Sequence, residues 1–187
     1  MAKAIILSAP SGSGKTTLVR HLVASIPQLA FSTSATTRKP REGEEHGKDY
    51  YFLTIPQFKA HLQKKEFVEY EEVYKGIYYG TLKQEIRKVW SQGKNIVFDV
   101  DVKGGLEIKK FFKDKALGIF IQAPNINVIK NRLISRGTET PESLEKRLAK
   151  IEEELTFASE FDRILVNSDL EEAKEEIVRV VTSFIRS

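Results

Sequence analysis

The chain of 187 residues contains no cysteine. Without thiols it can form neither a disulfide nor a thiolate metal site. Its only histidines, His21, His46 and His61, show no metal-ligand spacing. No stretch approaches the roughly 18 consecutive apolar residues of a membrane-spanning helix. We therefore expect a cytoplasmic protein with no membrane partner.

A strong charge of one sign is also missing. Thirty basic residues stand against 26 acidic ones, which gives a net charge of +4 and a pI near 9.1. This mild basicity suits an anionic ligand but is too weak to indicate nucleic acid, so we expect no nucleic-acid partner. The hydrophobic fraction of 41% is enough for a core, and the length predicts one domain.

A glycine-rich segment directly follows the apolar run of residues 4–7. It consists of Ser8, Ala9, Pro10, Ser11, Gly12, Ser13, Gly14, Lys15, Thr16 and Thr17. A buried strand, a turn, a lysine and a hydroxyl pair that opens a helix indicate a phosphate-binding loop. Gly12 and Gly14 let backbone N–H groups point at phosphate oxygens. We expect Lys15 to reach the β and γ phosphates of ATP and the Thr16 hydroxyl to ligate Mg²⁺.

One residue of this loop departs from the strict pattern. Ala9 stands where glycine is usual. Since alanine is the smallest residue with a Cβ, the loop can form if φ at this position is negative. The alternative interpretation of the segment is an ordinary small-residue turn between a strand and a helix.

Strands and helices are expected to alternate along most of the chain. Apolar runs predict buried strands at 3–8, 29–33, 95–100, 116–122 and 164–167, with helices at 15–26, 82–92, 105–113, 125–136, 141–158 and 170–185. This order predicts an α/β fold, a P-loop NTPase-type parallel sheet flanked by helices. Residues 33–81 break the rhythm with short aromatic strands and one helix, which predicts a small mixed α/β insertion.

A second candidate anion site lies within this insertion. Residues 34–52 contain Ser34, Arg38, Arg41, Lys48 and Tyr50. Two guanidinium groups and a phenol that converge on one point suit a phosphate monoester. The alternative is a solvated basic loop with neighbouring aromatic residues.

From this loop onward a series of motifs resembles the guanylate kinase family. The series consists of Thr36-Thr37-Arg38-Lys39-Pro40-Arg41-Glu42-Gly43-Glu44, Gly47-Lys48-Asp49-Tyr50-Tyr51-Phe52, Glu69, Tyr79-Gly80-Thr81, Asp99-Val100-Asp101, Arg132-Leu133, Arg136-Gly137, Arg147-Leu148 and Val166-Asn167. With the phosphate loop, the resemblance covers essentially the whole chain. It implies a CORE (1–33, 83–125 and 158–187), a GMP-binding part (34–82) and a helical LID (126–157).

The resemblance also implies an activity, the transfer of the γ-phosphoryl group of ATP to GMP, and to dGMP as well, in purine metabolism. The residues support this activity independently, because guanine offers two donors, N1–H and the N2 amine, on one edge. Glu69 and Asp101 can accept from that edge, while Ser34 and Thr81 can serve O6 or N7. The alternative for each carboxylate is an ordinary surface charge.

The remaining roles concern phosphates and metal. Residues expected at the GMP phosphate are Arg38, Arg41, Tyr50 and Tyr79. Asp99, at a strand end, is expected to hold Mg²⁺ through water, beside Thr16. Residues expected on ATP are those at positions 9–17, Arg132 and Asn167, the last of these beside adenine. The residues expected to act in catalysis are Lys15, Arg38, Arg136 and Arg147, with Gly137 as a hinge of the LID.

Two other interpretations of the sequence remain open. One is a kinase for another monophosphate, such as AMP or dUMP, which would leave the carboxylates without donors. The other is a binding module, since some guanylate-kinase-like domains of scaffold proteins bind phosphopeptides and catalyse poorly. The intact loop and the LID arginines favour an enzyme. The residues leave the oligomeric state open.

Overall fold

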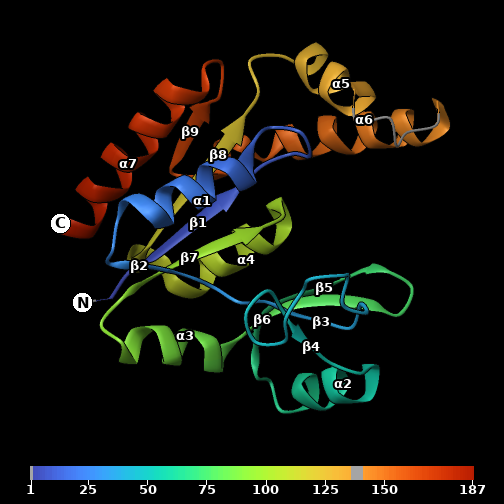
Figure 1. The fold of residues 1–187 in the computed structure, drawn as a ribbon, viewed down its shortest axis with the longest axis vertical. Coiled ribbons are helices and arrows are strands. Elements are labelled where there is room, and N and C mark those ends of the chain that lie inside the picture. Colours follow the sequence, from blue (N-terminus) through green and yellow to red (C-terminus); the bar gives the residue numbers. More distant parts are fainter. Residues whose placement is uncertain (1, 136–140) are drawn as a thin grey trace.

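The computed structural model describes residues 2–135 and 141–187, without the side chains of residues 132, 135, 141 and 142. A five-stranded parallel sheet in the order β2-β7-β1-β8-β9 forms its centre (Figure 1). The strands are β1 (Ala4–Ser8), β2 (Leu29–Phe31), β7 (Asn95–Val100), β8 (Ala116–Gln122) and β9 (Arg163–Val166). The predicted parallel sheet is therefore confirmed.

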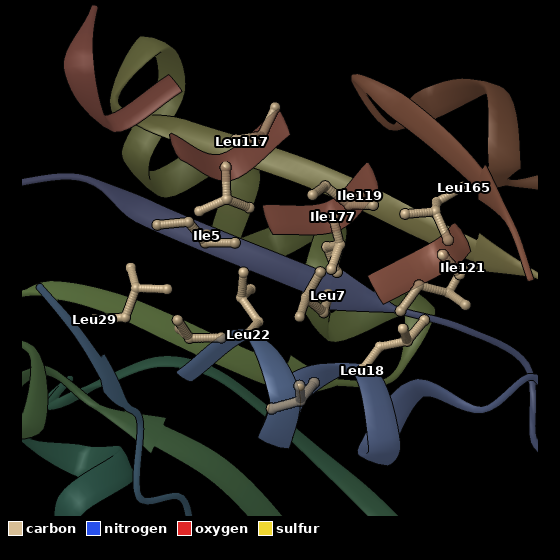
Figure 2. Close-up of a cluster of buried hydrophobic side chains, with 14 of the residues drawn as sticks. Ile5, Leu7, Leu18, Leu22, Leu29, Leu117, Ile119, Ile121, Leu165 and Ile177 are labelled. Atoms are coloured by element: carbon tan, nitrogen blue, oxygen red, sulfur yellow. The ribbon is translucent and has the colours of Figure 1, made fainter. Parts of the chain in front are cut away.

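Helices cover both faces of this sheet. One face carries α1 (Lys15–Ser25) and α7 (Leu170–Arg186), and the other carries α3 (Lys83–Ser91) and α4 (Val102–Phe112). Figure 2 shows how Leu18 of α1 and Ile177 of α7 meet Leu7 of β1 in the first of these cores. Each such buried aliphatic side chain contributes about 1.5–3 kcal/mol to folding. Short 3₁₀ turns at Lys113–Lys115 and Ala158–Glu160 precede β8 and β9.

The insertion is a separate small layer beside the main sheet. Its mixed sheet has the order β4-β3-β6-β5, which comprises β3 (Ala35–Thr36), β4 (Tyr51–Phe52), β5 (Phe67–Tyr74) and β6 (Ile77–Leu82). Helix α2 (Ile55–Gln63) begins at a capping box formed by Thr54 and Gln57. Phe58 of α2 stacks on Phe67 at 4.3 Å between ring centroids, so the insertion has a core of its own.

The predicted lid is a pair of helices, α5 (Ile126–Ser135) and α6 (Pro141–Thr156). Ile129 and Leu133 of α5 pack with Ile151 of α6 in a fourth buried cluster. In Figure 1 both helices project beyond the carboxyl ends of the central strands. Gly137, the expected hinge, lies outside the described residues.

Candidate functional site

The glycine-rich segment forms a loop between β1 and α1. Gly12 (φ 86°) and Gly14 (φ 89°) adopt left-handed conformations that residues with a side chain rarely adopt. Ala9 is buried and its φ is not positive, so the departure from the glycine pattern costs no backbone strain. Residues 9–17 line a cavity of about 490 Å³. The loop and the N-terminus of α1 thus present backbone amides to an open, anion-sized space.

Lys15 lies at the point where β1 and β7 end. Its Nζ is 2.6 Å from the Asp99 Oδ1 and donates to the Val100 carbonyl at 2.6 Å. Parallel pairing sets Ser8 opposite Val100, which brings the loop and the acidic strand end to one edge of the sheet. The sequence-predicted cation and acid are therefore neighbours.

The oxygen atoms near this edge of the sheet are the candidate ligands of the expected Mg²⁺. Thr16 lines the loop cavity, and Asp99 lies beside Lys15. Among residues 2–135 and 141–187 there is no group of three or more His, Cys, Asp or Glu side chains that could hold a metal ion. One hydroxyl and one carboxylate suit Mg²⁺ that arrives with a nucleotide, because Mg²⁺ takes its other ligands from water and phosphates. The donor set fits such an ion.

Asn167 lies beneath the loop. Its side chain is buried, and Nδ2 donates to the Ser13 carbonyl at 2.9 Å. A Cβ at position 14 would collide with this amide, so Gly14 is required for the close approach. The predicted place of Asn167 beside adenine stays a prediction. Its Nδ2 contacts the loop backbone across 154 residues, a contact that no local pattern reveals.

A second cleft, of about 300 Å³, lies between the central sheet and the insertion. Five of the predicted GMP residues line it, namely Ser34, Tyr50, Glu69, Tyr79 and Asp101. Asp101 and Lys150 line both this cleft and the loop cavity. The two spaces therefore adjoin, as a donor site and an acceptor site must.

Glu69 occupies the inner part of the cleft. Burial raises the pKa of its carboxyl to about 7, although a hydrogen bond from the Thr81 hydroxyl, at 2.6 Å, opposes the shift. Thr81 is fully buried and donates to Glu69, so the two predicted base-reading residues form one unit. A carboxyl held in this way can accept from donors of a ligand once it is ionised.

Asp101 is held by the start of α4. Its Oδ1 accepts from the Gly104 N–H at 2.7 Å, which makes it the N-cap of the helix. Because of this cap the helix begins at Val102, three residues before the predicted start. A Cβ at position 105 would collide with the Ser8 hydroxyl, so glycine at this position allows α4 to pack closely on β1.

Glu71 is a cleft residue that the sequence reasoning missed. It lines the cleft with Glu69 and Asp101. Hydrogen bonding with Asp101, followed by burial, raises the pKa of Glu71 to about 7. The alternation of β5 puts residues 69 and 71 on one face, and this was the signal that could have identified it.

Arg38 stands at the aromatic end of the cleft. Its guanidinium binds both oxygens of Glu44, at 2.8 and 2.9 Å, and its Nε lies 3.1 Å from the Tyr79 hydroxyl. It also lies over the Tyr50 ring at 5.3 Å. The pair with Arg38 lowers the pKa of Glu44 to about 2. Glu44 was not predicted as a site residue, because a partner six residues away in a loop has no sequence signature.

The other predicted arginines differ in their placement. Arg41 is exposed and its side chain does not line the cleft, while its backbone N–H donates to Glu44. Arg147 of α6 lines the loop cavity. Arg136 lies outside the described residues, and so does the side chain of Arg132, whose backbone belongs to α5. The site roles of these four residues stay predictions.

Fold and site together define a P-loop nucleotide kinase with a separate acceptor cleft. A parallel sheet ends in a phosphate loop, an acid lies at the neighbouring strand end, and an insertion supplies a second cleft that adjoins the first. Within the described part of the chain, no helix has the length and apolar character needed to cross a membrane.

Comparisons with known proteins give the particular family. The family model described as Guanylate kinase matches residues 1–184. The chain is 52% identical over 183 residues to a guanylate kinase of Bacteroides thetaiotaomicron, covering 98% of this chain and 90% of that protein. It is 46% identical to one of Porphyromonas gingivalis, with 99% of each covered. A crystal structure of guanylate kinase from Anaplasma phagocytophilum matches with a TM-score of 0.76 and 26% identity, covering 97% of this chain and 85% of that one. The chain belongs to the guanylate kinase family of ATP:GMP phosphotransferases.

Proposed function

We propose that the chain transfers the γ-phosphoryl group of Mg²⁺–ATP to the phosphate of GMP or dGMP, giving ADP and GDP or dGDP. The loop cavity takes the donor, and the cleft beside the insertion takes the acceptor. One observation carries this proposal: Asp101 and Lys150 line both spaces, so the donor site and the acceptor site adjoin. Phosphoryl transfer requires such adjacency, since catalysis rests on in-line positioning and charge neutralisation.

The base end of the cleft supports guanine as the acceptor base. Glu69 and Asp101 both offer carboxylate oxygens there, and guanine has donors at N1 and N2. Adenine has an acceptor at N1 and no N2 amine, so it would leave both carboxylates without partners. A pocket that depends on buried hydrogen bonds rejects the wrong partner by about 10⁴-fold or more.

The aromatic end of the cleft supports an acceptor phosphate. Arg38, Tyr50 and Tyr79 stand together there, with a 6.0 Å separation between the two ring centroids. The guanidinium and the phenols can donate to a phosphate monoester. Glu44 holds Arg38 in position and competes for it. No general base is required, since the acceptor phosphate is already ionised near pH 7.

The donor end depends on the loop. The amides of residues 9–17 and the ammonium of Lys15 neutralise the ATP phosphates, and Arg147 enters the same space from α6. Thr16 and Asp99 would hold Mg²⁺, which neutralises charge on the β and γ oxygens when bound. Arg136 is proposed to act beside Arg147 on the transferring group, Arg132 on ATP, and Arg41 on the acceptor phosphate. Closure of the LID over this space would exclude water.

The direct test is ADP formation from ATP and Mg²⁺ with GMP, dGMP, AMP, CMP, UMP or dUMP as acceptor. We expect turnover with GMP and dGMP only. Turnover with AMP or dUMP would be compatible with the fold but would contradict the proposed guanine pocket. Absence of turnover with every acceptor, in folded protein that still binds ATP, would favour a binding module.

A variant of Asn167 tests whether this residue acts through the loop. Asn167→Ala is expected to weaken the binding of ATP about tenfold, since it leaves the buried Ser13 carbonyl without its donor. Inorganic triphosphate should lose affinity by the same factor, because the loop binds phosphates only. Titration calorimetry with both ligands measures the two factors. A loss of affinity for ATP alone would instead indicate that Asn167 contacts the adenine.

A further inference from the structure

We propose that Glu85 is a positioning residue of the acceptor cleft, because its carboxylate holds Thr33 and Tyr51 beside two residues that line the cleft. This inference rests on the proposed function of the cleft. Glu85 itself lines neither the cleft nor the loop cavity, and it belongs to none of the motifs described above. Its effect on GMP is therefore indirect.

The first step is the burial of a carboxyl group where an apolar side chain would pack. Glu85 lies in the first turn of α3, and its side chain is 2% exposed. Its neighbours on α3, Ile86 and Val89, are buried against the central sheet and anchor the helix to that layer. A buried carboxylate costs free energy unless hydrogen bonds compensate for its lost hydration. The partners of Glu85 therefore decide what its charge contributes.

The second step is the set of donors around this carboxylate. The Tyr51 hydroxyl of β4 donates to Oε2 at 2.6 Å, and the Thr33 N–H donates to Oε1 at 3.4 Å. The Lys88 Nζ lies 3.3 Å from Oε2 and 3.2 Å from the Tyr51 hydroxyl. These three donors match an ionised carboxylate, which only accepts. An ion pair with Lys88 does not by itself explain the burial, since half of the lysine side chain is exposed and such pairs along a helix contribute little.

The third step is the place of these partners in the fold. The chain enters the insertion directly after Ser32, whose N–H still bonds the Val97 carbonyl of β7, and it leaves through β6 into α3 (Figure 1). Thr33 thus belongs to the entry, Glu85 follows the exit, and Tyr51 belongs to the insertion itself. Glu85 therefore ties both connections and β4 together at the junction of the two layers.

The consequence concerns the neighbours of these partners in the chain. Ser34 follows Thr33, Tyr50 precedes Tyr51, and both Ser34 and Tyr50 line the acceptor cleft. The two segments are also joined to each other, because the Tyr51 N–H donates to the Ser34 carbonyl at 2.9 Å. Glu85, fixed in α3, sets where this pair of segments stands relative to the central sheet. Its loss would weaken the binding of GMP and leave the loop that binds ATP unchanged.

Two single substitutions and their combination test this role. Tyr51→Phe removes the hydroxyl and keeps the ring, while Glu85→Leu removes the acceptors and keeps a similar size. We expect each to raise KM for GMP about tenfold, since each removes a hydrogen bond to a charged group, with KM for ATP and kcat within about twofold of wild type. The double variant should be no worse than Glu85→Leu, because that change already removes the acceptor of the Tyr51 hydroxyl.

A conservative variant separates the hydrogen bonds from the charge. Glu85→Gln keeps the size, and its amide can bond both the Thr33 N–H and the Tyr51 hydroxyl, because a hydroxyl accepts as well as donates. Its KM for GMP should stay within about threefold of wild type. Tyr70→Phe and Glu175→Leu, at exposed positions of β5 and α7, are the matched controls and should leave KM for GMP unchanged.

The outcomes separate this inference from the proposed function. If wild-type protein does not turn over GMP, the proposed function fails. If wild type is active and Tyr51→Phe and Glu85→Leu keep its KM for GMP, or raise KM for ATP by the same factor, Glu85 does not position the acceptor cleft. Equal impairment of Glu85→Gln and Glu85→Leu would assign the effect to charge and would also overturn the inference.

Two further measurements distinguish an altered cleft from a misfolded protein. Thermal unfolding shows whether each variant is folded, and calorimetric titration with GMP measures its binding without turnover. Should Glu85→Leu not fold, Tyr51→Phe decides the question, since it removes one hydroxyl and leaves the buried ring in place. A folded Tyr51→Phe variant that binds GMP as tightly as wild type would contradict the positioning role.

Discussion

Replacement of Lys15 by methionine is expected to lower kcat about a thousandfold, because it removes a preorganised positive charge from the transferring phosphates. Lys15 is the only lysine in the loop, and its ammonium lies beside Asp99 at the sheet edge. Methionine replaces the apolar stem of lysine and lacks only the terminal ammonium, so the loop should retain its conformation. Steady-state ADP formation at saturating Mg²⁺–ATP and GMP measures the effect.

Two controls make this result specific. Lys59→Met changes an exposed lysine of α2 and should leave kcat unchanged. Lys15→Met should still unfold cooperatively but at a lower thermal midpoint than wild type, because it loses a largely buried ion pair with Asp99 and a hydrogen bond to the Val100 carbonyl. Near-normal turnover by the folded Lys15→Met variant would remove the loop lysine from the mechanism.

The central sheet and the phosphate loop could be predicted because their signals are local. Strands buried on both faces read as unbroken apolar runs, as β1 and β8 do. The residues that form the loop between β1 and α1 are consecutive in the sequence. Even the meeting of Lys15 and Asp99 follows from local reasoning, since carboxyl ends of neighbouring parallel strands share one edge.

The contacts that could not be predicted join segments without a shared pattern. Asn167 and Ser13 are 154 residues apart, so no local pattern predicts their hydrogen bond. The start of α4 was predicted too late, because two adjacent glycines suggest a break while the Asp101 cap overrides them. The alternation of β5 places Glu71 on the same face as Glu69. Its other neighbours in the cleft come from distant segments, which this alternation does not predict.

A single substitution at Glu69 is expected to move function and stability in opposite directions. Glu69→Gln should raise KM for GMP about a hundredfold, since an acceptor oxygen becomes an amide that faces donors, and hydrogen bonds to a charged group contribute about 1.5–3 kcal/mol each. KM for ATP should change little, because Glu69 lines the acceptor cleft and not the loop cavity. Steady-state kinetics with each substrate varied in turn measures the two constants.

The same substitution should stabilise the protein at alkaline pH. Burial raises the pKa of Glu69 from 4.5 to about 7, so its stabilising contribution is complete below pH 4.5 and is lost as the pH rises toward 7. Glutamine does not titrate and avoids this loss. The free energy of unfolding of Glu69→Gln relative to wild type should therefore be about 2.5 kcal/mol higher at pH 8 than at pH 5.

Urea unfolding of both proteins at the two pH values measures this difference, and wild type with saturating GMP provides a further comparison. An equal difference at pH 5 and pH 8 would show that Glu69 is not held in a desolvated cleft. A stabilised variant with unchanged KM for GMP would separate burial from recognition and take Glu69 out of the base pocket. Loss of GMP binding together with a gain in alkaline stability is the expected combination, because the desolvation that makes the carboxylate selective for guanine also makes its charge costly to the free protein.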